Sequence, residues 1–336
     1  MPVQNDEPFI QRVESLIEPG EVCDLFFIQR FKKLMPNVLF KRLLYETSRR
    51  YPQIGFVIEP YSLFLFFRLK DLDRAKSLLP ARYELVKSRI VEGDEPDHYH
   101  GMGIFNTRGS TFWGTRLESY LIARDKETGL VSWIFIDIFS NTLIALPKAG
   151  VADPNSHGAV YTTSSKGDFF VNIAEDGTGR RLKLRGTLSR GQRKVPDKPL
   201  WIGGNTSIAY TEKLSGGDET PFAVIFDPAE VATALEIPVE DVKLEENGLM
   251  PGLAEPELCK VLCFPFAQHY IADSPGCRTF VKDEEDMVAK VHAIAERTQM
   301  ETFSTRGVKR LFLAGFLLFA LLSLGVLAAL IAVLVS

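Results

Sequence analysis

The sequence predicts a mainly β protein with additional helices, built on an antiparallel sheet that is curled into a barrel or a sandwich. Three observations lead to this prediction. Many short β-prone segments follow one another across residues 53–280, separated by turn sequences such as KETG and EDGTG. Residues 24–51 mix apolar and basic side chains at helical spacing, and residues 311–335 are almost entirely apolar. A helical region therefore precedes the sheet, and a single transmembrane helix follows it.

Residues 1–52 form the predicted helical region. Between residues 24 and 51, phenylalanine and leucine recur at helical spacing with lysine and arginine between them, and Pro36 divides the segment into two helices. A basic amphipathic helix suits the surface of an anionic membrane. The same pattern also fits two helices that pack on the domain and expose a basic face to solvent, so both interpretations remain open.

The central β domain is expected to extend over residues 53–280. No helical pattern separates most of its strand candidates, which argues against the βαβ units of a parallel sheet and favours antiparallel pairing. Short helices are expected at residues 71–80 and 227–236, each with an aspartate at its start. The strand candidates read YELVKSRIV, YHGMGIFNT, SYLIARD, LVSWIFIDIFS, AVYTTSS, DFFVNIA, RLKLRGTLS and TSIAYTEKL.

The C-terminal part combines a helix and juxtamembrane linker, residues 281–310, with an apolar helix, residues 311–335. Ser323 is the only polar side chain in that run, and about 20 apolar residues suffice to cross the hydrocarbon core of a bilayer. Arg306, Lys309 and Arg310 precede the run directly, and basic residues stay on the cytoplasmic side. The sequence therefore predicts a tail-anchored, single-pass membrane protein whose bulk is cytoplasmic.

Charge and motifs argue against several function classes. The chain has 39 Lys and Arg against 43 Asp and Glu, whereas nucleic-acid binders usually show a basic excess. No dinucleotide-binding or P-loop motif occurs, so no cofactor is expected. Asp97, His98 and His100 lie close together, but a zinc site needs a further ligand, and a polar turn explains the segment better. No metal site is therefore predicted, and the four cysteines are expected to be free thiols.

The segments LLPARYELV and TRLESYLIARDKETGLVSWIFIDIFSNTLIALPKAG, with the later strands AVYTTSSKGDFFVNI and RLKLRGTLS, resemble the acetoacetate decarboxylase-like superfamily. The resemblance covers residues 55–275 and implies a closed or cone-shaped antiparallel sheet. In the decarboxylases a lysine that follows a proline forms a Schiff base with the substrate ketone, and Lys148 matches that lysine by position. Glu118 matches an acidic residue on an earlier strand. Glu118 or Arg116 would then handle the carboxylate and the protons of the substrate.

The surroundings of Lys148 depart from the decarboxylase pattern. A lysine of pKa about 10.4 is protonated at neutral pH, so an imine-forming amine needs burial or a neighbouring cation to depress its pKa. The decarboxylases supply that cation with an adjacent second lysine, whereas this chain has Ala149. Ala145 and Leu146 also replace the glycine and the aromatic residue of the pattern. These departures favour a lysine that only ends a strand.

Three functions follow from this reading. The first is a membrane-anchored cytoplasmic protein that binds a hydrophobic or carboxylated small molecule, such as a lipid or a keto acid, inside the sheet. Phe112, Trp113, Trp133 and Phe135 are the candidate ligand-binding side chains. The second is a decarboxylase-like lyase that uses Lys148, and the third is a scaffold subunit of a membrane complex. The resemblance also implies self-association into a homo-oligomer.

Overall fold

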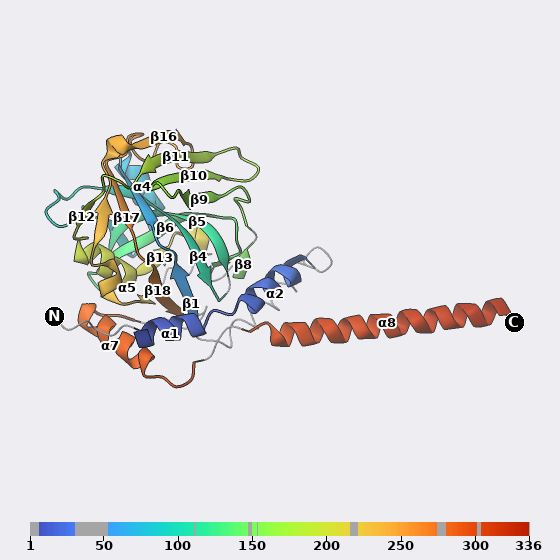
Figure 1. The fold of residues 1–336 in the computed structure, drawn as a ribbon. Helices are drawn as coiled ribbons and strands as arrows, with labels where there is room; N and C mark the ends of the chain where they lie inside the picture. The colour runs from blue at the N-terminus through green and yellow to red at the C-terminus, as the bar shows by residue number, and fades with distance from the viewer. Residues whose placement is uncertain are drawn as a thin grey trace.

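The computed structural model describes residues 7–30, 53–110, 112–146, 150–152, 154–215, 221–273, 280–300 and 304–335. Lys148 and Ala149 lie outside the described residues, as do residues 31–52, which contain most of the predicted basic helices. The prediction of a mainly antiparallel sheet with helices at both ends of the chain is confirmed (Figure 1).

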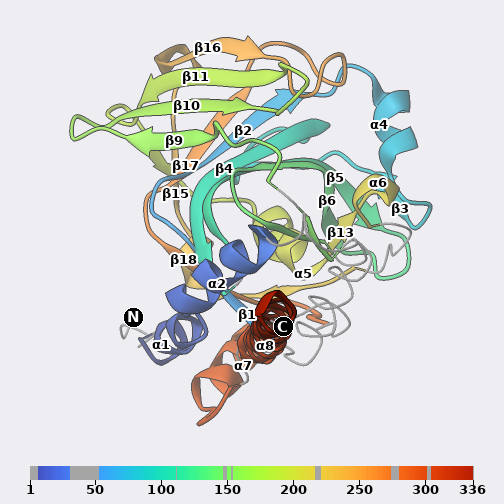
Figure 2. The same cartoon turned by 90° about the vertical axis from the view of Figure 1, so that its right-hand side faces the viewer.

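The largest sheet has twelve strands and is organised around β4 (Tyr99–Gly109). One edge of β4 pairs with β5 (Trp113–Asp125) along almost its whole length. The other edge is divided, because the first part of β4 pairs with β2 (Ser62–Arg68) and the last part with β1 (Gln53–Ile58). The sheet therefore branches at β4 and curves around a core (Figure 2). Its described strands run from β12 to β14 without closing into a ring.

The remaining strands of this sheet are short except for β6, and all its pairs are antiparallel except β13 with β6. They are β3 (Tyr83–Leu85), β6 (Val131–Ser140), β12 (Gln192–Lys194), β13 (Ile208–Tyr210), β14 (Val224–Ile225), β15 (Ala234–Glu236), β17 (Lys260–Phe264) and β18 (Gln268–Asp273). A separate hairpin joins β7 (Ile144–Leu146) to β8 (Gly150–Ala152).

A second sheet of four strands covers one face of the first. Its order is β16 (Val242–Asn247), β11 (Arg181–Thr187), β10 (Asp168–Ala174) and β9 (Val160–Thr163). Buried and more exposed residues alternate along β10 and β11, as expected for strands with one face on a core. Phe169, Val171 and Leu184 pack there with Leu65 and Ile104 of the large sheet. The two sheets thus form a sandwich around this core.

The opposite face of the large sheet carries a second core that is rich in aromatic rings. Trp201 lies in a π-helical turn (Pro199–Gly203), with ring centroids 4.9 Å from Phe64 and 5.6 Å from Trp133. Gly101 and Gly103 of β4 make room for these rings, because a Cβ on Gly103 would lie 2.9 Å from Phe64. The two glycines in YHGMGIFNT therefore allow large side chains to cross the strand.

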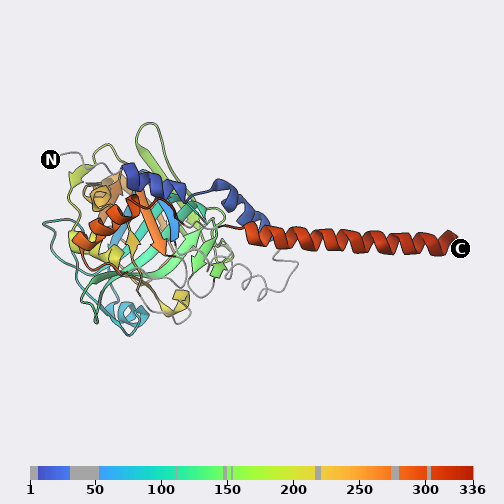
Figure 3. The ribbon, with the colours of Figure 1, turned by 90° about the horizontal axis from the view of Figure 1, so that it is seen from below.

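Helices flank the sheets. The helix α1 (Glu7–Ser15) packs on both β1 and α7 (Glu284–Ala295), and α2 (Pro19–Arg30) follows it (Figure 3). Smaller helices are α4 (Leu72–Leu78), α5 (Gly204–Thr206), α6 (Glu212–Ser215) and the 3-10 turns Pro228–Val231 and Val239–Asp241.

The helix expected at residues 227–236 is wrong beyond its first turn. Asp227 caps the 3-10 turn Pro228–Val231, accepting a hydrogen bond from the Ala229 N–H, but the chain then enters β15. That strand pairs with both β12 and β17, so inter-strand hydrogen bonds override the local helix propensity. Within residues 281–310, where a helix and a linker are expected, the helix α7 ends at Ala295.

The last helix, α8 (Arg306–Val335), projects away from the rest of the chain (Figure 1). Its segment Lys309–Val335 contains an 18-residue window with a mean hydropathy of 2.9, and by length and composition the segment could cross a membrane. Its leucines, such as Leu313 and Leu318, are more than half exposed.

Candidate functional site

Strand β5 presents Arg116, Glu118 and Tyr120 on one face, because alternate residues of a strand point to the same side. This face packs against the aromatic core. Opposite Glu118 and Tyr120, β4 has Gly103 and Gly101, which bring no side chain of their own to this face. The glycines of β4 therefore leave space in which polar groups of β5 can gather inside the domain.

These side chains contact one another. Arg116 Nη1 lies 3.3 Å from Glu118 Oε1, and each of the two side chains is only 11% exposed. The Tyr120 hydroxyl donates a hydrogen bond to Glu118 Oε2. The Arg116 guanidinium also lies over the Phe112 ring, 4.9 Å from its centroid, which is a cation–π geometry. A carboxyl group is thus held between a cation and a phenol.

Two residues from distant strands complete this group. Phe56 of β1 lies 5.9 Å from Phe112 and stacks on Tyr270 of β18 at 5.0 Å between ring centroids. Tyr270 is buried, and burial raises the pKa of its phenol, with smaller contributions from the charges of Glu230 and Glu118. The name "Arg116 cluster" is used below for Phe56, Phe112, Arg116, Glu118, Tyr120 and Tyr270.

The Arg116 guanidinium is incompletely satisfied. Its Nε is buried, and within the described part of the chain it has no hydrogen-bond partner. Guanidinium groups have five N–H donors, and a buried donor without a partner costs about 1–3 kcal/mol. A structural arginine would be expected to use these donors, so an unused edge points to an additional acceptor.

Burial governs the protonation of the cluster. It raises the pKa of Glu118, against the opposing effects of the Arg116 charge and the Tyr120 hydrogen bond. Burial and the neighbouring Glu118 also raise the pKa of Tyr120 well above its ordinary value. A protonated Glu118 would leave Arg116 as an interior cation without a counter-charge. Such a site can bind an anion, and its carboxylic acid can donate a proton.

The structure brings together several of the residues predicted from the sequence. Arg116, Glu118 and Phe112 belong to one cluster, and Trp133 and Phe135 lie 5.1 and 4.8 Å from the Tyr120 ring. Both of these side chains are buried among other rings, whereas Trp113 is 44% exposed. The ligand-binding role of these aromatic residues stays a prediction, as does the reactivity of Lys148.

Sequence reasoning missed three members of the cluster. Tyr120 could have been found, because it follows Glu118 by two residues on a strand and shares its face. Phe56 and Tyr270 could not, because they face each other only through the pairing of β1 with β18. No local pattern reveals a register between segments so far apart in the chain.

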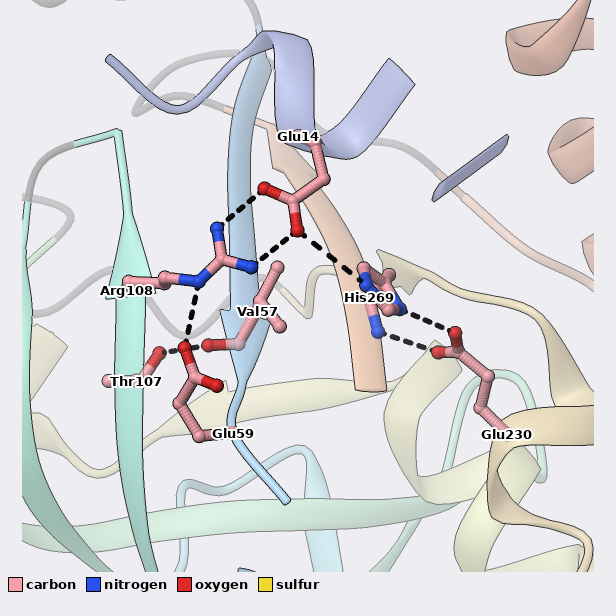
Figure 4. A network of polar contacts seen from close by, with 7 residues as sticks. All are labelled: Glu14, Val57, Glu59, Thr107, Arg108, Glu230 and His269. Atoms are coloured by element: carbon pink, nitrogen blue, oxygen red, sulfur yellow. Dashed lines mark hydrogen bonds and ion pairs between the residues drawn. The ribbon is translucent and has the colours of Figure 1, made fainter. Parts of the chain in front are cut away.

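A second polar network joins α1 to the outside of the sheet (Figure 4). Arg108 of β4 binds both carboxylate oxygens of Glu14 and, through Nε, Glu59 at 2.7 Å. His269 of β18 contacts Glu230 at 2.6 Å through both its Nδ1 and its backbone N–H, and its Nε2 lies 3.9 Å from Glu14. These five residues form the "Arg108 network".

Two of the three residues weighed as metal ligands have other partners, whereas the buried Nδ1 of His98 has no hydrogen-bond partner among the described residues. His100 Nε2 lies 2.6 Å from the Ser119 hydroxyl, and complete burial lowers the pKa of His100 to about 4, so the ring is neutral. Asp97 forms an ion pair with Arg68 at 3.2 Å. No group of three or more His, Cys, Asp or Glu side chains within the described ranges is placed to hold a metal ion.

The chain matches no family model and no curated protein. The solved structures that are similar to it include two enzymes. Acetoacetate decarboxylase from Legionella pneumophila subsp. pneumophila str. Philadelphia 1 is 13% identical, with a TM-score of 0.42 over 67% of this chain and 87% of that chain. The enduracididine biosynthesis enzyme MppR, complexed with the condensation product of pyruvate and imidazole 4-carboxaldehyde, is 13% identical, with a TM-score of 0.39 over 66% and 87%. Each is a likeness of fold, and the first has the name of the family that the sequence resembles.

Proposed function

We propose that this chain is a membrane-anchored protein that binds a small carboxylate with an apolar part in the Arg116 cluster. The observation that carries the proposal is the buried Arg116 guanidinium, whose Nε has no hydrogen-bond partner among the described residues. Its one carboxylate contact, Glu118, has a raised pKa because of burial. A carboxylate ligand would supply the missing charge and the missing acceptors.

The surroundings of Arg116 favour this chemistry. The planar guanidinium fork matches the two oxygens of a carboxylate, and a low-dielectric site strengthens the contact. The Phe112 and Phe56 rings lie beside it and would contact the apolar part of the ligand. A neutral Glu118 would donate a hydrogen bond to the same ligand instead of repelling it.

The proposal of a membrane anchor rests on α8 alone. Its apolar segment is long enough to cross a bilayer, and Arg306 and Arg310 at its start favour a cytoplasmic position for the folded part. Protease protection tests this orientation. In sealed vesicles with the cytoplasmic face outward, protease should digest the folded part and spare only residues beyond about 310.

Binding can be measured on the full chain in mild detergent. Isothermal titration with a short 3-keto acid and with a medium-chain fatty acid should detect binding of at least one of them. Arg116→Met should weaken that binding by about a hundredfold, because a desolvated charge pair is lost. Arg181→Met is the matched control, since Arg181 is exposed on β11. Equal affinities of the two variants, or no binding by the wild-type chain, would refute the proposal.

A lysine imine enzyme is the second candidate, and the raised pKa of Glu118 favours it, because a carboxyl group that keeps its proton to higher pH can act as a proton donor. In that reaction the Lys148 amine attacks the ketone, water leaves, and loss of carbon dioxide is followed by protonation of the enamine carbon. Borohydride added with the 3-keto acid should then fix a mass adduct on Lys148. A chain that binds the acid without forming the adduct is a binding protein and not a lyase.

A further inference from the structure

Residues at and just before the start of α8 form hydrogen bonds and an ion pair with side chains of α2. The backbone N–H and the hydroxyl of Thr305 both donate hydrogen bonds to Glu21, and the Ser304 hydroxyl donates to the same carboxylate at 3.2 Å. Lys309 forms an ion pair with Asp24. Glu21 is only 5% exposed, and it accepts from the backbone N–H of Thr305, the residue directly before α8, where a negative charge is favoured.

These contacts show that α2 and α8 run in the same direction. Asp24 follows Glu21 by about one turn, and its partner Lys309 follows Thr305 by about one turn. A further rise of ~4.5 Å along each helix reaches Phe27 in α2 and the first residues of the apolar run in α8. The two helices extend toward the same side in two views of the molecule (Figures 1 and 3). The end of α2 is therefore level with the start of the membrane-crossing segment.

The end of α2 has the character of a membrane interface. Leu25 is buried against the domain, whereas Phe27 is 60% exposed. Arg30 ends the helix and is exposed, and Arg306 and Arg310 are exposed at the start of α8. An aromatic ring beside arginines suits the boundary between lipid headgroups and acyl chains, and the positive charges suit anionic headgroups.

We infer that the C-terminal half of α2 is a second membrane contact, which lies in the interface of an anionic bilayer beside the point where α8 enters it. This inference rests on the proposed membrane anchor. A helix that crosses a bilayer alone leaves the attached domain free to rotate. The α2 contact, tied to α8 through Glu21 and Asp24, would fix which face of the sheet domain meets the lipid.

Photo-crosslinking tests the contact on the full chain. The chain is reconstituted into vesicles of equal parts phosphatidylcholine and phosphatidylserine, with p-benzoylphenylalanine replacing Phe27, Phe170 or Phe316. All three side chains are exposed, at 60%, 44% and 70%, so the replacement leaves the core intact. Phe316 lies in α8 and reports the anchor, whereas Phe170 lies on the four-stranded sheet and is the matched control. Phospholipid adducts are counted by mass spectrometry.

Position 27 should give adducts within about threefold of position 316, and position 170 should give almost none. Adducts at position 316 but not at position 27 overturn this inference and leave the anchor standing. Adducts at neither position overturn the anchor, and the inference with it. In vesicles of phosphatidylcholine alone, the yield at position 27 should fall about fivefold for each arginine that meets the lipid. An unchanged yield would overturn the assignment to anionic lipid.

Discussion

The Arg116 cluster and the Arg108 network each combine an arginine with glutamate side chains, but they differ in burial and in how many carboxylates the arginine contacts. Arg108 contacts two carboxylates, Glu14 and Glu59, and all of these side chains are partly exposed. Arg116 has one carboxylate contact, at 3.3 Å, and a buried Nε with no hydrogen-bond partner in the described ranges. The Arg108 hydrogen bond lowers the pKa of Glu14, whereas burial raises that of Glu118.

The difference distinguishes a structural arginine from a candidate binding arginine. The Arg108 network joins α1 to β4 and has its charges compensated within the protein. The Arg116 cluster is buried with its charges only partly compensated, which costs stability and is retained where a ligand completes the site. The predictions below test this distinction through stability, pH dependence and carboxyl titration.

The largest difference is expected in stability. Arg108→Met should lower the free energy of unfolding by about 2–3 kcal/mol, because it leaves Glu14 and Glu59 without their charged donor. Arg116→Met should change it by less than about 1 kcal/mol, because it removes a poorly satisfied buried cation. Urea unfolding of both variants in the same detergent, followed by circular dichroism, measures the two changes. Equal losses would make Arg116 a structural residue and remove the basis of the binding site.

The contributions of Glu14 and Glu118 to folding stability should have opposite pH dependence. The pKa of Glu14 is lowered on folding, so its contribution to stability is present above its unfolded value of 4.5 and is lost as the pH falls through the folded pKa. The pKa of Glu118 is raised on folding, so its contribution is present below 4.5 and is lost as the pH rises through the folded pKa.

Charge-neutral variants separate these contributions. Glu14→Gln should flatten the acidic side of the stability profile, and Glu118→Gln should flatten the side above the unfolded pKa of Glu118. Unfolding free energies measured from about pH 2 to about pH 8 give both profiles. A Glu118→Gln variant whose profile follows that of the wild-type chain would mean that Glu118 is already ionised when buried. Arg116 would then have its counter-charge within the protein.

The candidate residues from the sequence that meet in the cluster lie on or beside one strand, and their roles stay predictions. Arg116 and Glu118 share a face of β5 because strand residues alternate, and the turn sequences and apolar patterns indicated the antiparallel sheet. The sequence could not predict Phe56, Tyr270 or the pairing of Glu14 with Arg108, which depend on registers between distant segments. The failed helix at residues 227–236 has the same origin, because β15 is held by hydrogen bonds to two other strands.

The smallest effects are expected from removing one hydroxyl, either that of Thr107, which precedes Arg108 on β4, or that of Tyr120 in the Arg116 cluster. Thr107→Val removes a hydrogen bond of 2.9 Å from a buried hydroxyl to the Val57 carbonyl and should cost about 1 kcal/mol. Tyr120→Phe should cost less than that, because the hydroxyl contacts a carboxyl that is easily protonated. Its clearer effect should be on titration, since the Tyr120 hydrogen bond lowers the pKa of Glu118 and its loss raises that pKa further.

Infrared spectroscopy detects this change through the C=O stretching band of protonated carboxyl groups. In Tyr120→Phe the Glu118 band should persist to higher pH than in the wild-type chain, and Glu118→Gln should abolish it. Thr107→Val is the matched control, because it removes a hydroxyl from the outer region and should leave the band unchanged. A band that disappears at the same pH in the wild-type chain, in Tyr120→Phe and in Thr107→Val would show that Tyr120 does not govern the proton on Glu118. The case for a neutral acid beside Arg116 would then rest on burial alone.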